Sequence, residues 1–481
     1  TQLIDPGTWI EYGGLVIAGQ RRRRSVEELI RKTPADGLVA GIGSVNGDLF
    51  DEQRARTMFI SYDDTVFAGT QGGHGHIKTD RMLELANQLS LPVIFHAEGA
   101  GGRSGDSDGD PGRGFGGTEA TWLRLGELSG KVPIIGVTAG WCYAGNAAII
   151  GCTDIIIATE DALIAMGGPA VIEGSGMGAF LPEEVGAISD LAPAGSVDIV
   201  VKDHDEAIEI SKKTLSYFQG AIDDWEAHDQ RLLRHVIPEN HLRSFDIREA
   251  IELLADKDSV LEMRAEFGVG MVTAFVRIEG RPFGLTANNN AYIGGAIDSD
   301  AADKGARFMQ ICDAFDIPVL FLCDTPGIMV GPEIERTALV RHANRMFLVG
   351  SNLEVPSFTI IIRKAYGLGA IAMAGGNYTQ PLYTVAWPTG EFHGMGIEGS
   401  VKLGYRKELA AIEDPEERLE AYQDRVDQAY EAGKAINRAA AFGIDDTIDP
   451  ADSRRWLAGL LKSLPPTPVR EGKKRPFIDS W

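Results

Sequence analysis

The chain is poor in cysteine and in positive charge, and both shortages exclude classes of protein. Its 481 residues include only four cysteines, without a CxxC or a zinc-type spacing: Cys142, Cys152, Cys312 and Cys323. A disulfide framework is therefore not expected, and we predict buried free thiols in a reducing compartment, the cytoplasm. The 46 basic residues are outnumbered by 69 acidic ones, which gives a net charge of −23. Because such a surface repels phosphate backbones, we expect no nucleic-acid partner.

Long apolar runs are also scarce, and the one exception is not typical of a membrane span. Residues 132–153 carry no charge and approach the ~20 residues that a helix needs to cross a bilayer. Pro133, Gly140 and Asn146 interrupt this stretch, so a buried strand, a tight turn and a buried helix explain it better than insertion into a membrane. The chain opens at Thr1 instead of Met and shows no signal peptide, so we expect a fragment or a processed product.

Several familiar catalytic and metal-binding motifs are missing. There is no GxSxG nucleophile elbow and no P-loop GxxxxGK[ST]. His74 and His76 lie in a GGHGH segment without an apparent third ligand, which favours a loop role. Asp106, Asp108 and Asp110 resemble the start of an EF-hand, but no Glu stands at the twelfth position of the loop. We therefore expect no bound metal.

Glycine is abundant, with 58 residues that cluster at turns after short apolar runs. Runs of this kind occupy residues 92–97, 133–138 and 154–158, and a helical pattern covers 118–128. Uninterrupted apolar strands that alternate with helices are typical of a parallel sheet covered on both faces. The sequence therefore predicts an α/β fold.

The same pattern occurs twice along the chain. Pro92 before the first strand corresponds to Pro318, 226 positions later, and Pro133 corresponds to Pro356, 223 positions later. A glycine turn and a helix of small residues follow in each half, at 144–150 and 366–372. Two landmarks with nearly the same offset indicate a duplicated domain, and we place the two domains at 1–240 and 241–481.

The remaining segments predict helices and a terminal extension. Helices are expected at 333–348, at 203–235 and, with a turn, at 246–270. The charged stretch 407–442 is typical of a long helix with a solvated face, broken at Pro415. The residues from Pro465 onward are rich in proline and lysine and indicate an extension.

Two strand–glycine–helix segments, residues 138–149 and 363–373, carry the first chemical signal. A turn that enters a helix at small residues leaves backbone N–H groups without intrahelical acceptors. Such groups can hold an oxyanion and stabilise it by ~3–4 kcal/mol per well-placed donor. The residues alone also allow a simpler interpretation, in which Gly and Ala only permit close packing of helix on sheet.

A third glycine-rich turn, EGAGGR at residues 98–103, follows a strand directly. Its spacing is not GxGxxG, and an acidic loop follows in place of a helix, which argues against a Rossmann dinucleotide site. A loop that holds a thioester or a nucleotide through its backbone fits better. Arg103 is then either a phosphate contact or one half of a surface ion pair with nearby aspartates.

Four long motifs resemble the carboxyltransferase component of biotin-dependent acyl-CoA carboxylases. They are GCTDIIIATEDALIAMGGPAVIEG at 151–174, NNNAYIGGAIDSDAADKGARFMQICDAFDIPVLFLCDTPG at 288–327, RKAYGLGAIAM at 363–373 and WPTGEFHGMGIEGSV at 387–401. The resemblance covers nearly the whole chain. The segment YGGLVIAGQRRRRSVEELI is most similar to the long-chain, multidomain branch. The resemblance implies two tandem crotonase-like (ClpP/crotonase) ββα-superhelix domains, the first binding acyl-CoA and the second biotin.

The resemblance also implies a mechanism and its site residues. Carboxybiotin on a carrier protein releases CO2 in a closed site, the resulting biotinate takes the α-proton of the acyl-CoA, and the enolate attacks CO2. By match, the thioester enolate is held by the N–H groups of Gly145 and Asn146, and the biotin ureido oxygen by those of Leu368 and Gly369. Gly101, Gly102 and Arg103 match the family's CoA-side turn. Ala144, Tyr366 and Gly367 flank the two oxyanion turns, and Ile371 matches a residue at the acyl end.

The sequence departs from the family pattern at three places. Asn146 stands where a second glycine is common, Asn288–Asn290 replace Asn-Gln-Pro, and the second turn reads Gly-Leu-Gly instead of Gly-Gly-Ala. We expect a more crowded first turn and a biotin-side loop that lacks a stiffening proline.

The resemblance finally implies partners. Neither a biotinylation site nor an ATP-grasp loop is present, so carboxybiotin must come from a biotin carboxylase and a biotin carboxyl carrier protein or domain. We expect a homo-oligomer, at least a dimer and by resemblance a hexamer, with sites where the first half of one subunit meets the second half of another. Two alternatives remain open, a decarboxylase half-reaction on a malonyl-type CoA and a non-catalytic scaffold with blocked oxyanion turns.

Overall fold

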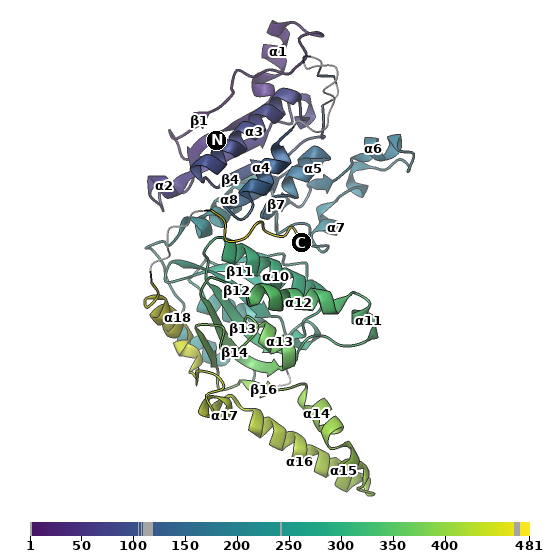
Figure 1. Ribbon diagram of the computed structural model, residues 1–481, viewed down its shortest axis with the longest axis vertical. Coiled ribbons are helices and arrows are strands. Elements are labelled where there is room, and N and C mark those ends of the chain that lie inside the picture. The colour runs from purple at the N-terminus through teal and green to yellow at the C-terminus, as the bar shows by residue number, and fades with distance from the viewer. Residues whose placement is uncertain (1, 104, 107, 109–118, 241–242, 466–471) are drawn as a thin grey trace. The chain divides into compact units, whose positions relative to one another are not determined.

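The protein folds as two compact units. The computed structural model describes residues 2–103, 105–106, 108, 119–240, 243–465 and 472–481 (Figure 1). One unit comprises Thr1–Ile222 with Val469–Trp481, and the other comprises Asp223–Pro468. The two units divide after Ile222, whereas we expected the boundary near residue 240. The C-terminal extension returns to the first unit, where the Ile478 N–H donates to Ser129 Oγ at 3.0 Å.

A seven-stranded sheet forms the first unit, in the order β1-β2-β3-β4-β5-β7-β9. Its strands are β1 (Ile10–Glu11), β2 (Leu38–Ser44), β3 (Arg56–Tyr62), β4 (Val93–His96), β5 (Ile134–Thr138), β7 (Ile155–Thr159) and β9 (Ile199–Val201). The first two pairings are antiparallel and the other four are parallel. β4 and β5 are buried along their whole length, which accounts for their uninterrupted apolar sequence.

Helices and a small second sheet complete this unit. α3 (Gly73–Leu89) and α4 (Thr121–Leu128) share a core with the sheet, to which they contribute Met82, Leu83, Leu125 and Leu128. Beyond β5, the strands β6 (Trp141–Tyr143) and β8 (Leu163–Ala165) pair in parallel. β6 leads directly into α5 (Gly145–Ile150). The uncharged stretch 132–153 is therefore strand, turn and helix, as expected.

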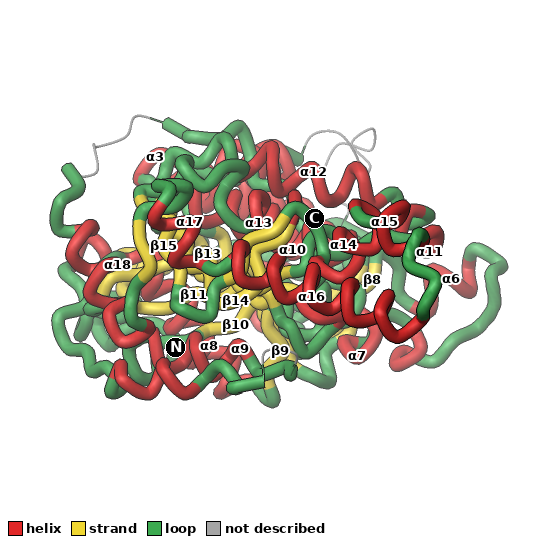
Figure 2. The backbone as a smooth tube through the Cα atoms, turned by 90° about the horizontal axis from the view of Figure 1, so that it is seen from below, coloured by secondary structure: helices red, strands yellow, loops and turns green. Residues whose placement is uncertain are grey.

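The second unit repeats this plan with eight strands. They are β10 (Leu261–Met263), β11 (Met271–Ile278), β12 (Arg281–Asn288), β13 (Val319–Thr325), β14 (Ser357–Tyr366), β15 (Tyr383–Ala386), β16 (Glu391–His393) and β17 (Asp446–Thr447). β10 to β12 pair antiparallel and the later strands pair in parallel. α10 (Ser299–Ala314) follows the antiparallel hairpin as α3 does, and α13 (Gly367–Ala372) follows β14 as α5 follows β6. Figure 2 shows these strands in yellow among the red helices, and the predicted α/β class is confirmed.

Several helices differ from the expected extents. The 333–348 helix is two, α11 (Pro332–Glu335) and α12 (Leu339–Gly350), because Ala338 between them adopts a left-handed φ of 61°. The 407–442 stretch forms α15 (Arg406–Ala410), α16 (Pro415–Gly433) and α17 (Ala435–Ala440). α16 starts at Pro415, as expected for a break there, and Asp414 caps it by accepting from the N–H groups of Glu416 and Glu417.

The segment between the two expected domains contains less helix than predicted. α8 (His204–Gln219) ends at Gly220, whose φ of 117° stops the helix, and only a 3-10 helix at Gln230–His235 follows. α9 (Ile247–Leu254) covers the start of the 246–270 stretch, and β10 occupies part of the remainder.

The prediction of free thiols is confirmed for all four cysteines, and the prediction that they are buried is wrong for one of them. All four thiols are free, and Cys142, Cys312 and Cys323 are buried. Cys152 is exposed, because it lies in a turn at the surface after Gly151, the residue that caps the C-terminal end of α5. Among the residues with described positions, no helix is both long and apolar enough to cross a membrane.

α10 is buried on nearly every face and carries a lysine inside the second unit. Lys304 is 2% exposed, and its Nζ donates to the Phe267 carbonyl at 3.0 Å. Burial lowers the pKa of Lys304 to about 7. The unfolded chain then binds a proton that the folded chain releases, so this group adds stability as pH rises from about 7 towards its unfolded pKa near 10.5.

We therefore expect Lys304→Met to flatten the pH dependence of stability. The Tm of the wild type should rise relative to that of the variant between pH 7 and pH 9.5, because only the wild type has a buried amine that titrates in this range. Differential scanning fluorimetry in matched buffers measures the difference between the two curves. A difference that stays constant over this range would contradict the assignment.

Candidate active site

The first predicted oxyanion turn lies where β6 passes into α5. Gly145 and Asn146 are the first two residues of α5, so their N–H groups have no acceptor within the helix. Ala144 before them has φ 53° and ψ −117°, a conformation that L-residues with a side chain rarely adopt. The turn thus presents two backbone donors and requires surrounding contacts to hold it.

The Asn146 side chain supplies part of that support. It is fully buried, its Nδ2 donates to the Glu98 carbonyl at 3.0 Å, and its Oδ1 accepts from the Gly101 N–H at 3.1 Å. We expected this residue to crowd the pocket. The structure instead directs the carboxamide away from the helix start and into the neighbouring loop.

The predicted CoA-side turn packs directly on this element. The Gln71 N–H donates to the Gly101 carbonyl and the Arg103 N–H donates to the Gln71 carbonyl, both at 2.8 Å. Gly102, between Gly101 and Arg103, is exposed, and its own N–H and carbonyl take no part in these two bonds. Gly101, with φ 82°, has no room for a side chain, because a Cβ there would lie 2.6 Å from Ala144 Cβ. The structure therefore brings Gly101, Gly102, Ala144, Gly145 and Asn146 together.

Arg103, however, points into the fold. It is 4% exposed and forms an ion pair with Asp36. Its Nη2 donates to the Thr70 carbonyl at 2.8 Å, and its guanidinium lies 5.2 Å from the centre of the Phe67 ring. Its Nη1 also lies 3.8 Å from Asp106 Oδ2, so the expected pairing with a nearby aspartate is present, but it is buried and the side chain is committed to these inner groups. Burial raises the pKa of the Asp36 carboxyl, and Arg103 opposes that shift.

The second predicted turn lies where β14 passes into α13. Leu368 and Gly369 are in the first turn of α13, and Leu368 is 61% exposed. Gly369 packs on the backbone of Gly327, since a Cβ would lie 2.6 Å from the Gly327 carbonyl carbon. Close packing and free helix-start donors, which the sequence offered as alternatives, therefore occur together here.

The flanking residues of the second turn are fixed by neighbours. Gly367 has φ 55° and faces the Gly394 carbonyl, 2.9 Å from where a Cβ would stand. The Tyr366 hydroxyl donates to Glu391 Oε2 at 2.7 Å, and together with burial this carboxylate raises the pKa of Tyr366. Ile371 is half-buried on α13. The structure thus holds Tyr366, Gly367, Leu368, Gly369 and Ile371 on one strand end and its helix.

Three asparagines stand where the resemblance placed a proline-containing loop, and each makes a side-chain hydrogen bond. Asn288 Oδ1 accepts from the Asp324 N–H at 3.2 Å, and Asn290 Oδ1 accepts from the Phe245 N–H at 2.9 Å. The Asn289 Nδ2 donates to the Val269 carbonyl at 2.9 Å. Side-chain hydrogen bonds thus restrain this loop in place of a proline ring.

Sequence reasoning missed one buried ion pair close to the second turn. Arg363 donates to Asp324 with Nη2 at 2.9 Å and Nε at 3.3 Å, and both residues are buried. Asp324 also accepts from the Lys364 N–H at 3.0 Å, which fixes the strand end that leads to α13. A charged residue directly after an apolar strand, as in LFLCD and TIIIR, was the available signal.

The remaining candidate groups have structural roles. His74 Nδ1 pairs with the Ile17 carbonyl at 2.7 Å, and Asp106 accepts from the Gly73 N–H at 3.2 Å. Asp110 lies outside the described residues. Within the described ranges, no cluster of three or more His, Cys, Asp or Glu could hold a metal ion.

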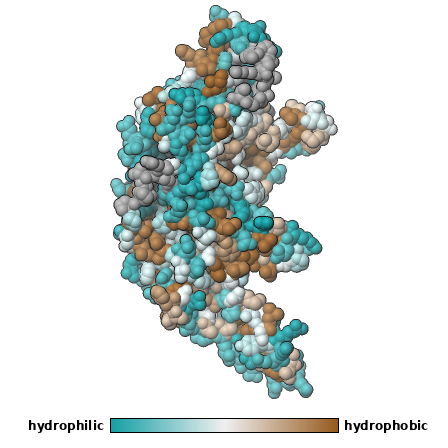
Figure 3. Space-filling model, viewed as in Figure 1, coloured by the Kyte–Doolittle hydropathy of each residue, from teal (hydrophilic) through white to brown (hydrophobic). Residues whose placement is uncertain are grey.

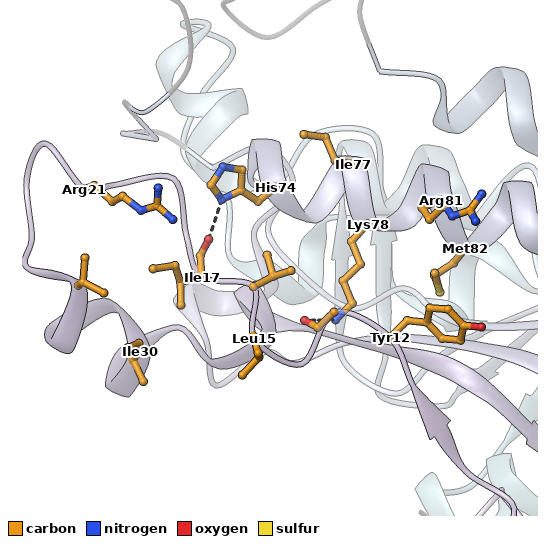
Figure 4. Close-up of a pocket in the computed structure, with 13 residues that line it drawn as sticks. Tyr12, Leu15, Ile17, Arg21, Ile30, His74, Ile77, Lys78, Arg81 and Met82 are labelled. Carbon is orange, nitrogen blue, oxygen red and sulfur yellow. Dashed lines mark hydrogen bonds between the residues drawn. The ribbon is translucent and has the colours of Figure 1, made fainter.

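A pocket of about 620 Å³ lies in the first unit, between the N-terminal segment and α3 (Figure 4). Its lining is mostly aliphatic, with the basic residues Arg21, His74, Lys78 and Arg81. Lys78 Nζ donates to the backbone carbonyls of Gly13 and Leu38. None of the predicted site residues lines this pocket, so it is separate from the two turns.

Comparison with known proteins assigns the family. The family model for the carboxyl transferase domain matches residues 1–471. An uncharacterized carboxylase, YngE, from Bacillus subtilis (strain 168) is 35% identical over 442 residues, which cover 89% of this chain and 84% of the relative.

Two solved structures agree with this match. A single-chain, multi-domain long-chain acyl-CoA carboxylase is 52% identical, with a TM-score of 0.89 over 95% of this chain, which spans 45% of that protein. A transcarboxylase 12S structure, solved as a hexamer with methylmalonyl-CoA bound, is 30% identical, with a TM-score of 0.83 over 98% of this chain and 90% of that one. The resemblance and the two-domain crotonase-like fold expected from the motifs are confirmed, and the chain belongs to the carboxyl transferase domain family.

Proposed function

We propose that this chain transfers the carboxyl group of carboxybiotin to the α-carbon of an acyl-CoA. The observation that carries the proposal is the pair of strand-to-helix turns, one in each unit, within a chain whose family is carboxyl transferase. Each turn ends a buried strand segment and opens a helix of small residues. The transfer involves a thioester and a ureido group, and each of their two carbonyl oxygens needs a turn that binds it.

In this proposal the first turn binds the acyl-CoA. The N–H groups of Gly145 and Asn146 donate to the thioester oxygen as it becomes an enolate, and negative charge on that oxygen strengthens both hydrogen bonds. Gly102, exposed beside this turn, offers backbone contacts to the CoA moiety. This assigns acyl-CoA binding to the N-terminal half, 1–240.

The second turn holds the ureido oxygen of biotin through the N–H groups of Leu368 and Gly369. When bound, carboxybiotin supplies both the CO2 and, after its release, the base for the α-proton. The local geometry fits such a group, because the exposed Leu368 leaves the start of α13 open while Gly369 is fixed against Gly327. The C-terminal half, 241–481, is thus assigned to biotin, and Ile371 to the wall at the acyl end.

The partners follow from the same assignment. A biotin carboxylase and a biotin carboxyl carrier, on another chain or on another part of a longer protein, deliver the carboxyl group. A homo-oligomer is supported by exposed apolar side chains around α6 (Pro169–Gly174), namely Met166, Val171, Met177, Phe180 and Leu181. Apolar colour is visible on this segment in Figure 3. The hexamer of the 12S relative supports assembly of the same kind.

The direct test is a carboxylation assay across acyl-CoA chain lengths, with the cognate carrier and biotin carboxylase. We expect turnover, with long chains among the substrates because of the 52% identity to a long-chain enzyme. Decarboxylation of a malonyl-type CoA without net carboxylation would favour the decarboxylase alternative. Absence of both activities, and of acyl-CoA binding, would favour the scaffold.

The two turns should respond differently to the same substitution. Gly145→Val brings a side chain against Gln71 Oε1, 2.1 Å from the Cβ position, and a flexible amide can move. Gly369→Val meets the backbone of Gly327 instead. We expect both variants to lose about 10²–10³ in kcat, as for a lost oxyanion donor, and only Gly369→Val to lower Tm markedly. Steady-state kinetics and thermal melting measure the two effects, and wild-type kcat in both variants would remove these assignments.

Arg103 should behave as a structural residue. Arg103→Ala leaves the Asp36 carboxylate buried without its partner, which costs about 3–5 kcal/mol for a buried pair. We expect a large drop in Tm, and Arg103→Ala/Asp36→Asn should recover part of it. A normal Tm together with a raised KM for acyl-CoA would show that Arg103 contacts the substrate after all.

A further inference from the structure

Two residues with amide side chains lie at the contact between the loop 98–103 and the turn 144–146. The first is Asn146, whose side chain donates to the Glu98 carbonyl and accepts from the Gly101 N–H. One carboxamide therefore satisfies a backbone acceptor and a backbone donor on the same loop. It is fully buried, where water cannot replace a lost partner at low cost.

The second residue is Gln71, which is 2% exposed. Its backbone bonds to Gly101 and Arg103 on either side of Gly102. Its side chain spans the gap to α5, where Oε1 stands 2.1 Å from the position of a Cβ on Gly145. Nε2 donates to the Tyr62 hydroxyl at 3.3 Å. Gln71 thus contacts both the loop and the helix start.

The turn needs such contacts because its own backbone does not favour this shape. Ala144 combines φ 53° with ψ −117°, and conformations of this kind persist only where the surroundings hold them. The close approach of Gly101 to Ala144 adds packing but no directional bond. Two backbone bonds tie the loop to β6 just before the turn, from the Gly99 N–H to the Trp141 carbonyl at 2.6 Å and from the Tyr143 N–H to the Gly99 carbonyl at 2.9 Å. Within the turn itself, the directional bonds to the loop come from the Asn146 side chain.

We propose that Asn146 and Gln71 are positioning residues: the Asn146 carboxamide and the Gln71 backbone hold the loop of Gly102, and the Gln71 side chain packs against Gly145, so that the loop stays at a set distance from the N–H donors of Gly145 and Asn146. This inference rests on the proposed function, in which the loop contacts CoA and the turn holds the thioester oxygen. A glycine at position 146 could not make these bonds.

The test compares Asn146→Gly, Asn146→Ala and Gln71→Ala with the wild type. We expect kcat/KM for acyl-CoA to fall about tenfold to a hundredfold, as for a small misplacement of substrate contacts. The KM for the carboxybiotin donor should stay unchanged, because the second turn is untouched. Asn146→Asp keeps the acceptor for Gly101 but sets a buried carboxylate oxygen against the Glu98 carbonyl, so it should not recover the loss.

The matched control is Asn87→Ala in the same unit. Asn87 is half-buried on α3, and its Oδ1 accepts from Lys131 Nζ at 2.6 Å, so the variant also removes a side-chain hydrogen bond. Its kinetics should match the wild type. Wild-type kcat/KM in both Asn146→Gly and Asn146→Ala, or an equal loss in Asn87→Ala, would overturn the proposal.

Amide hydrogen exchange separates this proposal from the proposed function. Peptides that cover residues 98–103 should exchange faster in the Asn146 variants and not in Asn87→Ala, whether or not any acyl-CoA is carboxylated. Faster exchange in residues 98–103 of a protein without carboxyltransferase activity would support the positioning role of Asn146 and refute the proposed function. Unchanged exchange there in an active enzyme would refute only the positioning role.

Discussion

The first unit depends on the contact between the loop after β4 and the turn after β6. Parallel strands bring these segments to the same edge of the sheet, but they do not fix the distance between them to the accuracy that a reaction needs. Here the two segments are joined by backbone bonds between Gly99 and β6, by the buried Asn146 carboxamide and by the absence of a side chain at Gly101. The rest of the unit, from the buried strands to α3, holds the two segments where these short-range contacts can form.

Buried ion pairs stabilise the surroundings of both turns. Arg103 with Asp36, and Arg363 with Asp324, are each almost fully enclosed. A charge in such a place is tolerated only with its partner, because its desolvation must be offset by the ion pair and by further hydrogen bonds. Both arginines also donate to backbone carbonyls, so each pair ties a loop to a strand end. The acidic surface of the protein and these internal cations therefore have separate roles.

The two halves share a plan but secure their turns by different means. The first uses side-chain amides from Asn146 and Gln71. The second packs Gly369 directly on Gly327 and restrains the preceding loop with Asn288 and Asn290. Such divergence after duplication is compatible with two turns that bind chemically different carbonyl groups.

Sequence alone predicted several buried strands, the parallel character of their sheets and the family, but not the antiparallel strands that precede them. Uninterrupted apolar runs such as those of β4 and β13 have few alternatives to a covered parallel strand, and long motifs in order are specific. It also gave the glycine turns and the helix start at Pro415. Tertiary structure decided what was non-local: the inward direction of Arg103, the role of the Asn146 side chain, the exposure of Cys152 and the return of the C-terminal residues to the first unit. The direction of Arg103, the role of Asn146 and the return of the C-terminus depend on partners far away in the chain, Asp36, Glu98 and Ser129, and neither periodicity nor spacing contains that information.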